Sequence, residues 1–116
     1  DAAELSSSPL RGAVFETATY VELRKRLSRA DELASLFFYR DRAIEVDFML
    51  HRGGRFALLE SKWTELPDPS DASNMDRLAR TLGEDRILSR QLVCRTECGF
   101  PLGATRAVGL QAIDVA

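Results

Sequence analysis

The length, composition and charge of the chain restrict it to one globular domain. Its 116 residues suffice for one ordinary domain but not for two, and 45% hydrophobic residues fit a packed core. No apolar run approaches the roughly 18 residues that a membrane span needs, and no secretory signal is visible. A net charge of −2 provides no bulk attraction for nucleic acid. The first residue is Asp rather than Met, which suggests a piece of a longer protein or a processed chain.

The two cysteines and the single histidine make a disulfide framework and a zinc site poor explanations for this chain. Cys94 and Cys98 are too few for a disulfide scaffold, and their spacing is not that of a redox pair. A zinc site needs four ligands, and His51 lies far from both cysteines in sequence. We therefore expect two reduced thiols and a cytoplasmic location.

The first third of the chain predicts a linker followed by a helix. Residues 1–10 are expected to form a linker or frayed end, because residues 1–8 are small and polar. Ser8 and Pro9 are a plausible N-cap and first helical position, and the helix is expected to run to Leu27 or Ser28. Its apolar residues fall on two faces, which predicts packing on both sides: Val14, Ala18 and Val21 on one, and Tyr20, Leu23 and Leu27 on the other.

Three strands are predicted next, over residues 35–40, 44–51 and 55–63. Gly53 and Gly54 favour a two-residue hairpin turn between the last two. The apolar side chains of the middle strand are expected on one side of the sheet: Ile44, Val46, Phe48 and Leu50.

The second half of the chain predicts a loop, a helix and one or two strands. Residues 64–74 are rich in Pro, Asp and Ser and are expected to form a loop. Apolar residues at helical spacing begin at Met75, and Gly83 ends that helix. Residues 87–93 and 107–115 predict strands, with a turn-rich segment over 97–103 between them. The element order predicts an α/β domain with a mixed sheet and the first helix on one of its faces.

The Gly53-Gly54 turn fixes a register with chemical consequences. It places Asp47 directly opposite Glu60, and alternation then puts both carboxylates on one side of the sheet together with Glu45 and Lys62. Two facing carboxylates repel each other at a cost of roughly 0.2–1 kcal/mol, which a divalent cation between them would turn into attraction. Hard oxygen ligands suit Mg²⁺ or Mn²⁺, so this pair predicts a metal site.

Lys62 is predicted to serve that site, because only 2 of the 16 basic residues are lysines. Lys62 is expected about 7 Å along the strand from Glu60, and from there its ammonium can reach a metal-bound water or a phosphate. The competing interpretation is a solvated Asp47 and a surface ion pair between Glu45 and Lys62, worth about 0–1 kcal/mol. The spacing alone does not decide between these two interpretations.

Four short segments carry a resemblance to a known family: Gly12–Glu16, Tyr39–Asp41, Glu45–Phe48 and Leu59–Lys62. Together with the element order, they resemble the PD-(D/E)xK nuclease superfamily. More narrowly, they resemble a nuclease-like domain of unknown function found at the C-terminal end of many prokaryotic AAA+ ATPases. Val46 stands where that superfamily usually has its proline. The resemblance implies a three-layer restriction-endonuclease-like core over residues 11–116.

The same resemblance implies roles for individual residues. Asp47 and Glu60 would be metal ligands, Lys62 the catalytic lysine, and Glu16 the acidic residue on the first helix that completes the site. The implied activity is a Mg²⁺- or Mn²⁺-dependent phosphodiesterase acting on DNA, with an AAA+ ATPase domain in the same polypeptide and no membrane partner. The alternative is a catalytically inactive nuclease-fold module that serves binding or assembly, which the missing basic stretch favours.

Three other features receive structural predictions. Trp63 alternates away from Lys62 and is expected in the core, whereas His51, beside the glycine turn, is expected to be exposed. Four arginines could form a basic face for phosphate, although a solvated helix flank explains them equally well: Arg77, Arg80, Arg86 and Arg90.

Overall fold

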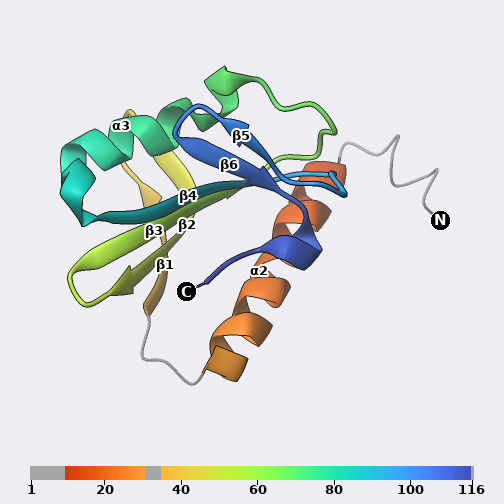
Figure 1. Ribbon diagram of the computed structural model, residues 1–116, viewed down its shortest axis with the longest axis horizontal. Coiled ribbons are helices and arrows are strands. Elements are labelled where there is room, and N and C mark those ends of the chain that lie inside the picture. The colour runs from red at the N-terminus through yellow and green to blue at the C-terminus, as the bar shows by residue number, and fades with distance from the viewer. Residues whose placement is uncertain (1–9, 31–34, 116) are drawn as a thin grey trace.

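A computed structural model describes residues 10–30 and 35–115, which contain two α-helices and six strands (Figure 1). The helices are α2 (Arg11–Ala30) and α3 (Ser73–Leu82), and the strands are β1 (Ser35–Arg40), β2 (Glu45–Arg52), β3 (Arg55–Ser61), β4 (Ile87–Val93), β5 (Phe100–Leu102) and β6 (Thr105–Val108). Three short 3₁₀ helices complete the order: η1 (Pro69–Ala72), η2 (Glu84–Arg86) and η3 (Leu110–Ala112).

The six strands form one mixed sheet in the order β1-β2-β3-β4-β6-β5. Strands β1, β2 and β3 are antiparallel, β4 runs parallel to both β3 and β6, and β5 is antiparallel to β6. The predicted α/β class and mixed sheet are therefore confirmed. Within the described residues, no helix is long and apolar enough to cross a membrane.

The two α-helices cover opposite faces of the sheet and give the domain three layers (Figure 1). On one face, Phe15 and Leu23 of α2 pack against apolar side chains of β2, β3, β4 and β6. On the other face, Met75 and Leu78 of α3 pack against Val46, the β3 residue Leu58 and β4. Each helix buries one apolar stripe, and the central strands are buried on both sides.

The predicted hairpin is confirmed, including its register near the turn. Gly53 and Gly54 have φ values of 58° and 78°, the left-handed region that a type I′ turn requires at both central positions. The ladder between β2 and β3 runs from Arg52 paired with Arg55 to Phe48 paired with Leu59. The pairing ends there, so the register extrapolated to Asp47 and beyond is not formed.

A β-bulge in β2 changes which face its side chains occupy. Phe37 of β1 pairs with Met49 but Tyr39 pairs with Val46, so β2 has one residue more than β1 in this stretch. The prediction that all four apolar residues of β2 lie on one side is therefore wrong. Ile44 and Val46 face α3, whereas Phe48 and Leu50 face α2.

The helix α2 is buried along one line rather than on two faces. Phe15, Thr19 and Leu23 face the sheet, whereas Val14 and Val21 are 47% and 45% exposed. The predicted packing on both sides of this helix is thus wrong within the described residues. The helix continues past Ser28 to Ala30, and its predicted start at residues 8–9 lies outside them.

The remaining boundaries differ locally from the prediction. The expected loop contains η1, the segment over residues 97–103 contains the short strand β5, and the last strand is β6 (Thr105–Val108) rather than 107–115. Gly83 does end α3, with a φ of 108°. Strand β3 ends at Ser61, so Lys62 and Trp63 lie just beyond the sheet.

Candidate active site

Asp47 lies at the bulge of β2 and bridges to β3 where the ladder has ended. Its Oδ2 accepts hydrogen bonds from the Ser61 N–H at 2.9 Å and from the Ser61 hydroxyl at 3.3 Å. The prediction of a direct Asp47–Glu60 ladder pair is therefore corrected. Strand β2 bends away from β3 at the bulge, so the Asp47 side chain occupies the position of a missing main-chain bond. Among the described residues, no donor contacts its other oxygen, Oδ1.

Glu60 is a half-buried carboxyl group with an unusual protonation equilibrium. Burial is the largest cause, and the charges of Asp47, Asp71 and Glu45 add to it, so that the pKa of Glu60 rises to about 8 although Lys62 partly opposes this. No hydrogen bond or ion pair to its carboxyl group is formed by the described residues. Because a group with this pKa is mostly protonated at neutral pH, Glu60 holds a proton that a cation could displace.

The pKa of Asp47 is also raised, mainly by burial and further by the charge of Glu45, although the Ser61 hydrogen bonds oppose both effects. Burial, followed by the charges of Asp47 and Glu45, raises the pKa of Glu16 as well. The largest cause for all three carboxyl groups is burial, and the negative charges of their neighbours add to it.

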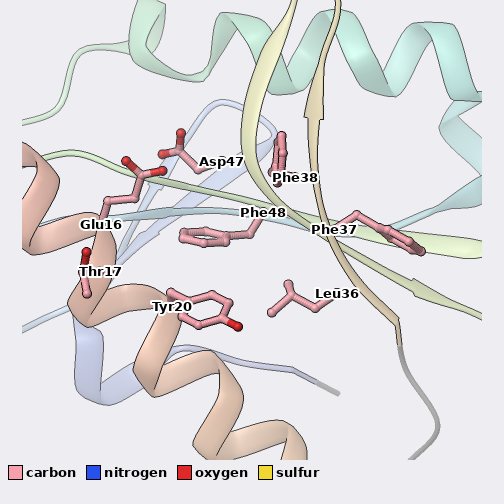
Figure 2. Close-up of a pocket in the computed structure, with 8 residues that line it drawn as sticks. All are labelled: Glu16, Thr17, Tyr20, Leu36, Phe37, Phe38, Asp47 and Phe48. Carbon is pink, nitrogen blue, oxygen red and sulfur yellow. The ribbon is translucent and has the colours of Figure 1, made fainter.

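Glu16 extends from α2 toward Asp47, and the two carboxylates face each other (Figure 2). They line the same two pockets. Glu60 lines neither pocket, and alternation from Leu58 places it on the α3 side of the sheet. The four predicted site residues therefore do not share one face. They surround the end of the sheet where β2 and β3 separate.

Lys62 and Glu45 do not pair with each other, which corrects that prediction. Lys62 Nζ donates to the Asp71 carboxylate of η1, and Glu45 pairs with Arg40 at 3.2 Å. The physical reason is again that the pairing of β2 with β3 ends at Phe48 and Leu59, before it reaches Glu45 and Lys62. The Lys62 side chain remains 51% exposed, so its ammonium can be reached from solvent.

Asp71 is the site residue that sequence reasoning missed. It closes a capping box in η1, because its Oδ2 accepts from the Asp68 N–H at 2.8 Å while Asp68 caps Ser70 at 2.9 Å. The Asp-x-x-Asp spacing around Pro69 was a visible capping signal. Its contact with Lys62, however, depends on how this loop folds back over the end of β3.

A pocket of about 490 Å³ connects three of the four predicted residues, Glu16, Asp47 and Lys62. Trp63 forms part of its wall, with its ring edge-to-face to Phe15 at 5.5 Å and beneath the Arg95 guanidinium at 4.2 Å. Trp63 is therefore half-buried at the margin of the core rather than inside it. The full lining is Arg11, Gly12, Glu16, Asp47, Ser61, Lys62 and Trp63.

The remaining sequence predictions concern a histidine, the possible basic face and the two cysteines. His51 is exposed, as expected, and stacks on Phe56 at 4.8 Å. Arg90 does not contribute to an open basic face, because its side chain is 10% exposed and pairs with Asp76 and Glu84. Both cysteines are free thiols, Cys94 buried and Cys98 exposed.

The described carboxyl groups offer oxygen donors for a hydrated metal ion but no cluster of three. Among residues 10–30 and 35–115, no three His, Cys, Asp or Glu side chains stand close enough together to hold a metal ion, so the predicted three-residue set is not assembled. Mg²⁺ commonly binds through one or two carboxylates and several waters. Asp47, with one uncommitted oxygen, and Glu60, with a displaceable proton, match that requirement.

Comparison with known proteins gives one result. A family profile described as "Domain of unknown function (DUF4143)" matches residues 11–113, which is most of the chain. No curated protein and no solved structure matches.

Proposed function

The chain belongs to the DUF4143 family, whose members are often associated with AAA ATPases, and from that premise we propose that it is a metal-dependent phosphodiesterase with a restriction-endonuclease-like core that acts on DNA. We further propose that an AAA+ ATPase domain lies in the same polypeptide.

One observation carries this proposal: two half-buried carboxyl groups without a cationic partner lie beside an accessible lysine. Asp47 and Glu60 form no ion pair within the described chain, although burial raises the pKa of both, and neighbouring carboxylates raise it further. A structural network would pair such groups, because an unpaired buried charge is costly. Groups kept unpaired at the end of a sheet are typical of a site that binds an ion or substrate.

Each side chain has a specific role in this proposal. Asp47 and Glu60 would hold Mg²⁺ or Mn²⁺, with Glu16 acting through water. The metal would supply an activated water and offset charge on the phosphate. Glu60 would release its carboxyl proton on binding, and Lys62 would leave Asp71 and place its ammonium against a phosphate oxygen.

A second candidate function is a catalytically inactive nuclease-fold module used for binding or assembly. The contact between Lys62 and Asp71 favours it, because a lysine held in an ion pair is not directed at a substrate. The absence of a three-ligand metal cluster among the described residues favours it too.

Metal titration and a cleavage assay separate the two candidates. Mn²⁺ should raise the melting temperature of the wild type and of Lys62→Ala, but not of Asp47→Asn. Of these three proteins, only the wild type should cleave linear or branched DNA. The matched control is Glu65→Gln, which should behave like the wild type, because the Glu65 carboxylate is 70% exposed, pairs with Arg95 and does not line the pocket that connects the site residues. Stabilisation by Mn²⁺ without cleavage by the wild type would favour the inactive module, and no stabilisation in any variant would refute the metal site.

A further inference from the structure

A second pocket, of about 600 Å³, adjoins the carboxylates on the α2 side of the sheet. Its volume lies within the range of small-molecule sites. Glu16 and Asp47 line it as well as the first pocket, so the two pockets meet at these residues. The rest of its lining is mostly aromatic or aliphatic: Thr17, Tyr20, Leu36, Phe37, Phe38 and Phe48.

Two exposed aromatic rings border this pocket from different elements. Tyr20, one turn after Glu16 on α2, stacks on Phe48 with ring centroids 6.4 Å apart and remains 46% exposed. Phe38 on β1 is 77% exposed and lies on the same side of its strand as Leu36, toward α2 (Figure 2). The neighbouring Phe37 also borders the pocket, but its ring points to the other side of the strand (Figure 2).

We propose that this aromatic pocket binds an unpaired nucleobase, and that the substrate of the carboxylate site is single-stranded DNA or a splayed DNA end. The proposal rests on the proposed function, because the carboxylates at the mouth of the pocket repel phosphate unless a cation neutralises them. With a phosphate held at Asp47, the base next to it along the strand enters the space between Tyr20 and Phe38.

Charge supports a single strand over a duplex. A protein that binds duplex DNA gains most of its affinity from contacts of Lys and Arg side chains with the phosphate groups. This chain has a net charge of −2, so another contribution to affinity is needed. Base stacking on aromatic rings supplies it for single strands, whereas the bases of a duplex are already stacked and paired.

The test compares a phenylalanine of the pocket with one at the opposite edge of the sheet. A fluorescently labelled 12-nucleotide oligothymidylate and an abasic oligomer of equal length are titrated with the full chain in Ca²⁺, and binding is followed by anisotropy. Phe38→Leu keeps the apolar bulk but removes the ring, so it should weaken oligothymidylate binding roughly 5- to 150-fold and leave abasic binding unchanged. Phe38→Trp should retain binding. Phe100→Leu is the control and should leave the binding of both oligomers unchanged, because Phe100 lies on β5, at the opposite edge of the sheet from β1, and does not line this pocket.

Three results would overturn the inference: unchanged binding by Phe38→Leu, an equal loss for the abasic oligomer, or preferential binding of a tetra-arginine peptide. The last result would show that the acidic mouth recruits a cation rather than a base. Thermal melting of each variant excludes loss of fold as the cause.

The results also distinguish a failure of this inference from a failure of the proposed function. If binding depends on Phe38 but the wild type does not cleave DNA, only the proposed function is contradicted. If the wild type and Phe38→Leu bind equally well and both cleave DNA, only the inference is contradicted.

Discussion

Replacing Glu60 by Gln should stabilise the metal-free protein, and the gain should grow with pH. The pKa of Glu60 rises from 4.5 to about 8 on folding. Below pH 4.5 the group is protonated in both states, so its contribution to stability is fully present. Between pH 4.5 and 8 the unfolded chain binds fewer protons than the folded one, and stability is lost with rising pH. Above pH 8 the loss is complete.

The size of the effect follows from the same pKa values. Each pH unit in this window costs about 1.4 kcal/mol, which gives at most about 5 kcal/mol over the whole range. Glu60 is only partly buried, so solvent screening reduces this to about 1–3 kcal/mol. Gln keeps the size of the side chain and carries no charge. The difference between Glu60→Gln and wild type should therefore be small at pH 5 and about 1–3 kcal/mol at pH 8.5.

Urea unfolding in EDTA, followed by the fluorescence of the single tryptophan Trp63, measures this difference directly. Trp63 is half-buried against Phe15, so its emission should report unfolding. Glu65→Gln serves as the control and should show no growth of the difference with pH. If the gap between Glu60→Gln and wild type stays constant within about 0.5 kcal/mol from pH 5 to pH 8.5, Glu60 does not carry the proposed proton.

Three further predictions concern the metal, the hairpin and a buried hydroxyl. Mn²⁺ affinity should increase about tenfold per pH unit between pH 6 and 8 as the Glu60 proton is displaced, and calorimetry should find no such slope in Glu60→Gln. Gly54→Ala should lower the free energy of unfolding by about 1–2 kcal/mol in urea melts, because its φ of 78° strains an L-residue although no atom lies within 4 Å of the added Cβ. Thr105→Val should raise the melting temperature, with a gain of up to about 1 kcal/mol, because the buried Thr105 hydroxyl has no hydrogen-bond partner among the described residues. An unchanged or lower melting temperature would show that the hydroxyl is satisfied.

The candidate site was predictable in its residues but not in its pairing. Asp47, Lys62 and Glu16 all line one pocket, and the charge of Asp47 acts on Glu60. Their metal-binding and catalytic roles stay predictions. The sequence predicted that Lys62 lies opposite Glu45, whereas in the folded protein Lys62 forms an ion pair with Asp71. Asp71 lies nine residues away along a loop whose path no periodicity specifies.

The sequence by itself determined the elements whose causes are local. An aromatic-rich segment defined β1 and alternating apolar residues defined β2, both within one residue, and Gly53-Gly54 determined the turn and the register beside it, because these depend on side chains and φ values within a few residues. Only the tertiary structure decided where that register stops. The bulge at Asp47 lies in the pairing of β2 with β1, and Lys62 lies beyond the end of the β2–β3 ladder, where its side chain pairs with Asp71. Both depend on partners distant in sequence, so the site is set by the way β2 and β3 separate.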